Sequence, residues 1–494
     1  MMMEGLCYYR PYVDPEFESL IERINPPRVC IDNDYSKDCT LVKVDSVKRH
    51  GILLEVVQIL ADLDLLISKS YISSDGGWFM DVFHVTDKFG NKITDQDLIH
   101  YIQQAVCTRR NSKEAQLYSG SEVMSSKHGP TEHTVLEMTV ADQPGLLSEV
   151  LAVLAELGCH VATAVAWTHN HRAACILYVD DQVLGRPITD KKRLSHIQEQ
   201  LQTLVEARHK NGEKRSVRLT APTPLQTHVE RRLHQLMLAD EDYKTCECCG
   251  RSVEGHNHKQ KNGISNGPDD GMGCEYIHVS IENCKERGYS VVNIRCEDRP
   301  KLLFDTVCAL TDMHFIVFHA AITSKCSIAV QEYYVRHKDG CTLDTENERQ
   351  RVTQCLIAAV ERRASQGLRL DITANDRLGL LSDVTRVFRE YGLSVSRAEI
   401  STRADKATGV FYVTDASGRK ISRDTLEAVK REIDGTVQVY DTAPSSLTSP
   451  SSSMISQNRS RSGEVDHRPS FLSLGSLLWS RLERISSNFG PTKV

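Results

Sequence analysis

The chain has 494 residues, of which 40% are hydrophobic and 26% charged, as in a globular protein large enough for several domains. Its formal net charge of -6 argues against the extended basic surface of a nucleic-acid-binding protein, so no nucleic-acid partner is expected. No window holds 18 consecutive apolar residues, and we expect no integral membrane segment.

Two further features indicate the compartment. The 16 cysteines are scattered and several lie inside apolar runs, which is typical of buried free thiols in a reducing environment. The first twenty residues carry four acidic side chains and no continuous apolar stretch, unlike a secretory signal or a transit peptide. We therefore expect a cytoplasmic protein, with the nucleus as a second location.

One pattern occurs four times along the chain: a short alternating strand, a polar turn and the leucine-rich start of a helix. The four copies cover residues 40–74, 134–168, 289–324 and 368–402. In the second copy, "TVLEMTV" precedes the turn "ADQPG", apolar residues then recur three and four positions apart, and Gly158 stands where the helix would end. A repeat of this size decides the fold before any local motif is interpreted.

Each copy continues with a second β-rich run and a mostly polar helix. The expected caps of that helix are Asp95, Asp190, Asp344 and Ser422. A last strand is clear at 216–220 and 437–440, weak at 116–118 and absent after the third copy, where the strand-like 275–283 lies just upstream. Each unit is thus β-α-β-β-α-β, an α+β fold of ferredoxin-like type with helices on one face of an antiparallel sheet.

The repeats divide the chain into six parts. These are unit 1 at 38–120, unit 2 at 131–221, a helix plus flexible linker at 222–273, unit 3 at 274–363, unit 4 at 367–442 and a tail at 443–494. Each unit leaves one sheet face open, with alternating apolar positions that need a partner. We therefore expect the tethered units to pair within the chain.

The tail and the linker contain two further motifs. The tail is Ser-rich and then contains "FLSLGSLLWSRLERISSNF", an amphipathic segment that would dock on the repeats, bind a protein partner or lie on a membrane surface. In the linker, thiols and imidazoles suggest a zinc site, but their spacing fits no common ligand pattern: Cys246, Cys248, Cys249, His256 and His258. We favour a flexible linker and predict neither a metal nor a cofactor.

The strand followed by D-x-P-G-L-L and an amphipathic helix resembles the ACT domain, and four such units are similar to the plant ACT-domain-repeat proteins. The resemblance covers about residues 38–442 and is carried by "ADQPGLL", "ANDRLGLL", "VVNIRCEDRPKLLFDTVCALTDM" and "HGILLEVVQILADL". ACT domains usually bind amino acids or other small ligands between paired units and regulate another activity. The resemblance therefore implies a ligand sensor.

The turn before the helix is the expected ligand contact, because a glycine admits a ligand to the backbone and the first helical N–H groups suit a carboxylate. Only the second and fourth turns combine an acidic residue with the glycine three positions later. The predicted ligand-binding residues are Asp142, Gly145, Leu146, Asn375, Asp376, Gly379 and Leu380. Gly51 and Asp298 are weaker candidates, because Lys48 replaces the acid in the first turn and Lys301 replaces the glycine in the third.

Alternative interpretations remain at the level of the sequence. Each turn Asp would contribute about 0.5–2 kcal/mol if it only capped its own helix. The motifs G-x-x-x-x-G-K-[ST], G-x-S-x-G and H-E-x-x-H do not occur, so we predict a non-enzymatic amino-acid sensor. The alternatives are an interaction scaffold whose units serve only for pairing, and a regulatory subunit of a biosynthetic enzyme.

Overall fold

The computed structural model describes residues 27–47, 51–75, 78–108, 133–208, 214–222, 227–244, 277–364, 367–403, 405–417 and 421–441. Three predicted features lie outside these ranges: the weak strand at 116–118, the linker with its cysteines and histidines, and the tail.

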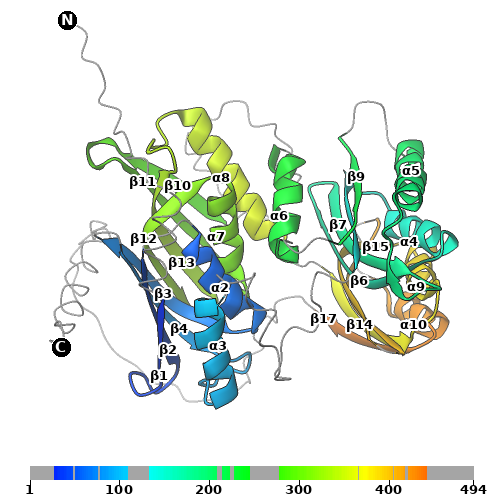
Figure 1. Ribbon diagram of the computed structural model, residues 1–494, viewed down its shortest axis with the longest axis horizontal. Helices are drawn as coiled ribbons and strands as arrows, with labels where there is room; N and C mark the ends of the chain where they lie inside the picture. Colours follow the sequence, from blue (N-terminus) through cyan, green and yellow to red (C-terminus); the bar gives the residue numbers. More distant parts are fainter. Residues whose placement is uncertain are drawn as a thin grey trace, which may run out of the picture. The chain divides into compact units, whose positions relative to one another are not determined.

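The described strands form two antiparallel sheets (Figure 1). The first sheet runs, in spatial order, β1 (Arg28–Asp32), β2 (Thr40–Val47), β4 (Trp78–Thr86), β3 (Leu66–Asp75), β12 (Phe315–Lys325), β13 (Ile328–His337), β11 (Tyr289–Glu297) and β10 (His278–Cys284). The second runs β17 (Thr436–Asp441), β14 (Leu368–Asn375), β16 (Lys406–Asp415), β15 (Leu393–Arg403), β6 (Cys159–His169), β7 (Arg172–Asp181), β5 (Thr134–Ala141) and β9 (Ser216–Thr220), with the short β8 (Arg186–Pro187) beside β7. Unit 1 therefore pairs with unit 3, and unit 2 with unit 4.

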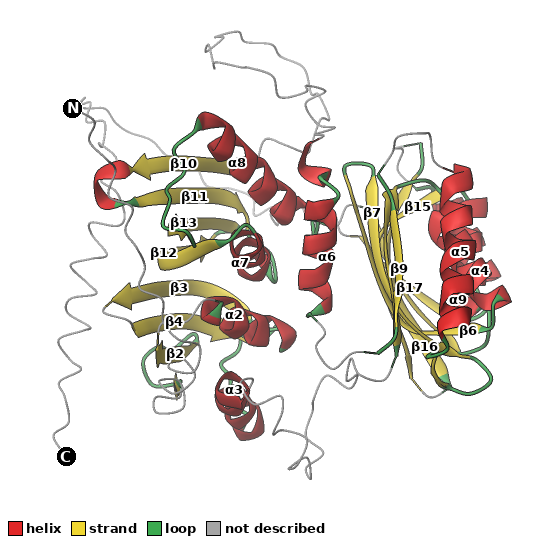
Figure 2. Ribbon diagram, turned by 45° about the horizontal axis from the view of Figure 1, so that its top comes forward, coloured by secondary structure: helices red, strands yellow, loops and turns green. Residues whose placement is uncertain are grey.

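Helices lie on one face of each sheet (Figure 2). Those of the first sheet are α2 (Ile52–Asp62), α3 (Gln96–Thr108), α7 (Leu302–Asp312) and α8 (Glu346–Glu361). Those of the second are α4 (Leu146–Glu156), α5 (Lys191–Arg208), α9 (Leu380–Glu390) and α10 (Arg423–Glu432). Between units 2 and 3 lie α6 (Val229–Ala239) and the 3-10 turn η2 (Asp242–Lys244), and a second such turn, η4 (Lys285–Arg287), joins β10 to β11.

The same pairing geometry is used twice. Strand β3 meets β12 with Tyr71 opposite Ala321, and β6 meets β15 with Val165 opposite Glu399. Each of these residues lies twenty positions after the residue that precedes the first helix of its unit, so both pairs share one pseudo-twofold register. One continuous hydrophobic core spans units 1 and 3, and another spans units 2 and 4. The predicted α+β fold and the pairing of units within the chain are confirmed.

The source of the outer strands differs between the two sheets. In units 2 and 4 the chain follows β-α-β-β-α-β, and the outer strands β9 and β17 come last. In units 1 and 3 the outer strand comes first: β1 lies along β2, and β10 lies along β11. The strand expected at 275–283 is therefore the outer strand of unit 3, whereas unit 1 uses a strand that begins ten residues before its predicted boundary at residue 38.

Local signals position the helices. The first helix of every unit follows a residue in the left-handed region, and the last helices of units 3 and 4 follow Thr345 and Ser422, whose side chains accept from the backbone N–H three residues on. In unit 3 the cap of α8 is Thr345 and not the predicted Asp344, because Thr345 forms a reciprocal capping box with Glu348.

Helix α6 covers part of the open face of the second sheet. Its Leu233 and Met237 pack on Trp167 and Ile176, and all four side chains are fully buried.

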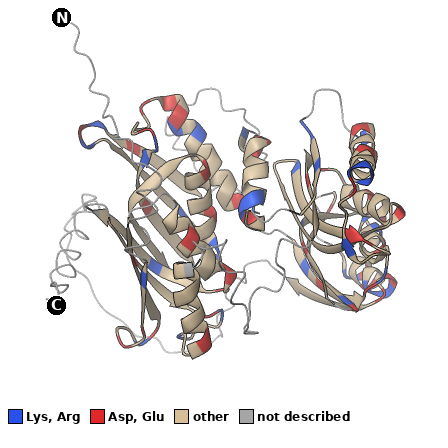
Figure 3. Ribbon diagram, in the orientation of Figure 1, with Lys and Arg blue, Asp and Glu red and all other residues tan. Residues whose placement is uncertain are grey.

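Lys and Arg are interspersed with Asp and Glu over both sheets and their helices (Figure 3). None of the helices in the described ranges is both long and apolar enough to cross a membrane.

Candidate functional site

The second, third and fourth turns each bring a helix N-terminus to the interface between two paired units. The residue before the helix has positive φ in all four units: 86° at Gly51, 81° at Gly145, 63° at Lys301 and 77° at Gly379. Glycine adopts this conformation without penalty, whereas a side chain at Lys301 costs about 1 kcal/mol. The first N–H groups of the following helix lack partners within the helix and carry partial positive charge, as a carboxylate ligand requires.

The second turn lies at a small cavity between units 2 and 4. Three predicted residues, Asp142, Gly145 and Leu146, line it together with residues of α9 and β15 from the paired unit. Its volume is about 40 Å³, which is space for little more than one water molecule of roughly 30 Å³.

Arg389 of α9 explains why this cavity is small. A Cβ placed on Gly145 would clash with Cδ and Cγ of Arg389, so the aliphatic part of that side chain lies directly over the glycine. Its guanidinium lies 3.5 Å from Glu149 on α4. The glycine therefore admits the arginine of the paired unit to the backbone, in the place that the sequence assigns to a ligand.

The third turn lies at a larger cavity between units 3 and 1, with a volume of about 360 Å³. Its walls include Asp298 and Lys301 from the turn, Gln331 from β13, and Val57 and Ala61 from α2 of the paired unit. This volume is in the range of about 300–1,000 Å³ of small-molecule pockets. Of the two cavities, the larger thus contains a residue that the sequence ranks as a weaker candidate, Asp298.

One position in the paired helix accounts for the difference in size. The residue ten positions after the turn residue is Ala61 in unit 1, Ala155 in unit 2, Thr311 in unit 3 and Arg389 in unit 4. By the pseudo-twofold pairing, Ala61 faces the third turn and Arg389 faces the second. A methyl side chain leaves the cavity at the third turn open, whereas a guanidinium chain fills the one at the second.

The carboxyl group of Asp298 is half-buried at the edge of this cavity. Burial raises its pKa above the usual range, and hydrogen bonds from Ser324 and from the backbone N–H of Arg299 oppose that shift. Asp298 is therefore an acceptor that a ligand ammonium group can reach.

The fourth turn is arranged differently. Asp376 lies 2.8 Å from Nε2 of His160 on β6, so its carboxylate binds the paired unit and does not cap α9. Leu380 is buried in the core, while Asn375 is exposed at the end of β14. A Cβ on Gly379 would meet no atom within 4 Å, and none of these four predicted residues lines either cavity. Gly51 of the first turn does not line either cavity.

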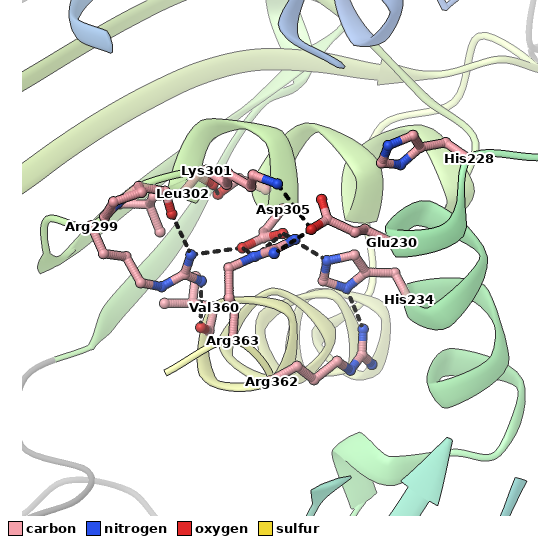
Figure 4. A network of polar contacts seen from close by, with 12 residues as sticks. His228, Glu230, His234, Arg299, Lys301, Leu302, Asp305, Val360, Arg362 and Arg363 are labelled. Carbon is pink, nitrogen blue, oxygen red and sulfur yellow. Dashed lines mark hydrogen bonds and ion pairs between the residues drawn. The ribbon is translucent and has the colours of Figure 1, made fainter. Parts of the chain in front are cut away.

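The third turn is also joined to a buried network of charges (Figure 4). Asp305, on the first turn of α7, is fully buried and accepts from both Arg363 and Arg299, and it lies 2.9 Å from His234 of α6. Burial alone would raise the pKa of Asp305, but the two guanidinium groups hold it well below its usual range. Burial lowers the pKa of His234 and keeps its imidazole neutral at pH 7.

Lys301 and Arg299 extend this network to the wall of the cavity. The Lys301 ammonium lies 3.0 Å from Glu230 of α6, and Glu230 also accepts from Arg363 at 2.9 Å. Arg299 donates to the carbonyl of Val360 at the end of α8. The guanidinium of Arg363 in turn lies over the ring of Trp167 on β6, 4.9 Å from its centroid. Charged side chains therefore connect the third turn to α6 and to unit 2.

A second cluster lies beyond α6. Asp242 of η2 accepts two bonds from the buried Arg362, and it lies 2.8 Å from Nδ1 of His169, whose Nε2 lies 3.0 Å from Glu361. Burial would lower the pKa of His169, but the hydrogen bonds to the two carboxylates outweigh it and raise that pKa. The hairpin between β6 and β7 is thereby attached to the end of α8.

Sequence reasoning missed Gln331, Ala61 and Arg389 as residues that shape the sites. Gln331 interrupts the alternating strand "SIAVQEYYV" at an inward-facing position, which is a detectable signal for a buried polar side chain. Ala61 and Arg389 carry no such signal, because their importance depends on which unit faces which.

Comparison with known proteins gives the family. The model of the ACR family N-terminal ACT domain matches residues 35–113, and the ACT domain model matches residues 134–206 and 369–434. The ACT domain-containing protein ACR1 of Arabidopsis thaliana is 49% identical over 97% of this chain and 98% of its own length. The chain belongs to the ACR family of ACT domain-containing proteins. ACR3 of the same plant is 51% identical over 86% of this chain and 89% of its own length.

Membership of the ACR family agrees with the four repeated units and the two antiparallel sheets. ACT domains generally bind amino acids as regulatory modules. In this ACR-family chain the two paired interfaces are not equivalent, since one leaves a cavity of small-molecule size at its turn and the other places an arginine there.

Proposed function

We propose that the chain is a non-enzymatic regulatory protein that binds an amino acid or a similar small ligand between paired ACT units. The observation that carries this proposal is the cavity of about 360 Å³ at the third turn. It combines the N–H groups of Leu303 and Phe304, which have no acceptor among the described residues, a carboxylate at Asp298 and an apolar wall from α2 of the paired unit. Such a cavity offers a contact for the carboxylate, the ammonium group and the side chain of an amino acid.

The second turn is a secondary candidate. Asp142, Gly145 and Leu146 lie together at its cavity, but a ligand there requires Arg389 to move. Displacement of an exposed arginine that keeps its charge in water costs little, so a ligand carboxylate can compete with Glu149 for its guanidinium. Asn375, Asp376, Gly379 and Leu380 remain predicted contacts whose engagement would first require Asp376 to leave His160.

Titration calorimetry of the intact chain against the twenty amino acids tests the proposal. We expect at least one of them to bind, and at about 100 times its dissociation constant to add roughly 2.7 kcal/mol to the free energy of unfolding. An interaction scaffold would show neither heat nor a thermal shift with any amino acid. A regulatory subunit would instead co-purify with the enzyme that it controls.

A further inference from the structure

The cavity at the third turn is rich in hydrogen-bond donors without acceptors. Leu303 and Phe304, in the first turn of α7, line it, and their backbone N–H groups have no acceptor among the described residues. Their neighbours are engaged, because the N–H of Leu302 donates to Arg299 and that of Asp305 donates to Lys301. Two adjacent, oriented N–H groups at a helix start suit one carboxylate.

Gln331 provides an independent donor at the inner wall. Its side chain is only 1% exposed, and its Oε1 accepts from the hydroxyl of Tyr333 at 2.5 Å. The Nε2 group has no partner within the described ranges, although the residue lines the cavity. A donor that lacks an acceptor at a cavity wall gains a hydrogen bond from a ligand that supplies an acceptor oxygen.

The charges around the cavity favour an anion. The wall and the ion pairs behind it hold four cations and three carboxylates: Arg299, Lys301, Lys325 and Arg363 against Asp298, Glu230 and Asp305. Lys325, at the rim, has no carboxylate partner among the described residues. A ligand of net charge minus one would balance this set, whereas a neutral zwitterion would not.

We propose that the cavity between units 1 and 3 binds an amino acid with a carboxylate side chain, aspartate or glutamate. One carboxylate lies at the N–H groups of Leu303 and Phe304, the ammonium group faces Asp298, and the second carboxylate accepts from Nε2 of Gln331. The methylene groups between them pack on Val57 and Ala61 of unit 1. This inference rests on the proposed function and specifies the class of its ligand.

Calorimetry of the intact chain with L-aspartate, L-glutamate, L-glutamine and L-leucine as probes tests the ligand class. We expect one of the two acidic amino acids to bind at least tenfold more tightly than L-glutamine and L-leucine. Equal or tighter binding of a neutral amino acid would overturn the inference and leave the proposed function intact. Absence of binding by all twenty amino acids would overturn both.

The variant Gln331→Met removes the buried donor at nearly constant volume and should weaken binding of the acidic amino acid about tenfold or more, because a charge-assisted bond is lost. Gln438→Met is the control on an exposed strand, since Gln438 also accepts from a tyrosine two residues on, Tyr440, but lies on β17 away from the cavity. Its affinity should equal that of the parent. Unchanged affinity in a folded Gln331→Met would contradict the assignment.

Lys325→Gln gives a second test that does not depend on the core. This exposed side chain can be replaced without loss of packing, and removal of its charge should weaken binding of the acidic amino acid several-fold at low salt. Lys338→Gln, on an exposed turn at the opposite end of the β12–β13 hairpin, should have no effect. If both variants bind the acidic amino acid alike, the charge argument is wrong.

Discussion

The pair of units 1 and 3 and the pair of units 2 and 4 share strand order, register and helix placement, but they differ in what lies over the turn. At the third turn the paired helix presents Ala61 and leaves a cavity of about 360 Å³. At the second turn it presents Arg389, and about 40 Å³ remains. One side chain from the opposite unit therefore determines whether a turn of the same backbone geometry has room for a ligand.

The two pairs of units also differ in how deeply an acidic side chain at a helix start is buried. The acidic residue four positions after the turn residue is Asp305 in unit 3 and Asp383 in unit 4. Asp305 is fully buried between two arginines and a histidine, whereas Asp383 is 40% exposed beside Arg377 and Arg386. The comparison shows that equivalent positions of a repeat acquire different roles from the segments packed against them, here α6 and the end of α8.

The largest effect is expected from Asp305→Ala. The substitution leaves Arg363 and Arg299 buried without their shared carboxylate, which should lower the free energy of unfolding by about 3–5 kcal/mol. Asp383→Ala is the control at the equivalent exposed position and should cost no more than about 1 kcal/mol. Urea unfolding followed by circular dichroism measures both; equal losses would contradict the distinction between the two helix starts.

A smaller effect is expected at Asp81, the residue of unit 1 that occupies the position of Gln331. Burial raises the pKa of this carboxyl to about 8, and the backbone of Ser73 opposes the shift only in part. The folded chain therefore holds a proton that the unfolded chain releases, and the contribution of Asp81 to stability falls as the pH rises from about 4 to 8.

Asp81→Asn removes this dependence. Relative to the parent, the variant should gain on the order of a few kcal/mol at pH 8, and the gain should shrink toward pH 5. Asp45→Asn, on the exposed face of the neighbouring strand, should change stability by less than about 0.5 kcal/mol. Urea titrations at the two pH values measure the difference, and a gain that is independent of pH would refute the raised pKa of Asp81.

A third prediction concerns a substitution that should make the second turn resemble the third turn. Arg389→Ala removes the side chain that lies over Gly145 and should open a cavity there, with a stability loss of less than about 1 kcal/mol because the arginine is exposed at its head. We expect a second equivalent of amino acid to bind in calorimetry. Arg386→Ala, one turn earlier on α9, is the control and should leave the stoichiometry unchanged.

The smaller of the two pH-dependent effects concerns His169. Its raised pKa means that the protonated imidazole stabilises the folded state below about pH 6.5, and that this contribution is lost as the pH rises through the folded pKa. His169→Gln should therefore cost roughly 1–2 kcal/mol at pH 6 and less at pH 9. Thermal unfolding at both values checks this; a cost that grows with pH would reverse the assigned charge state.

Much of the fold follows from short-range patterns. The four turns, the helix starts and the outer strand near residue 280 are predictable, because alternation, 3.6-residue periodicity and positive-φ glycines are local properties. Which unit pairs with which is not predictable in this way, since all four are tethered and offer similar edges. The sequence therefore ranks Asp298 as a weaker candidate because of Lys301, whereas the open space beside Asp298 depends on Ala61 of another unit.

The direct test of the account is calorimetry on Ala61→Met, with the amino acid that binds the parent most tightly. This variant changes unit 1 alone and places a flexible side chain in the cavity at the turn of unit 3. We predict that affinity falls at least tenfold while the fold is retained, and that Ala155→Met, the equivalent change in unit 2, binds like the parent. Parental affinity and stoichiometry in a folded Ala61→Met would show that the ligand does not bind between units 1 and 3.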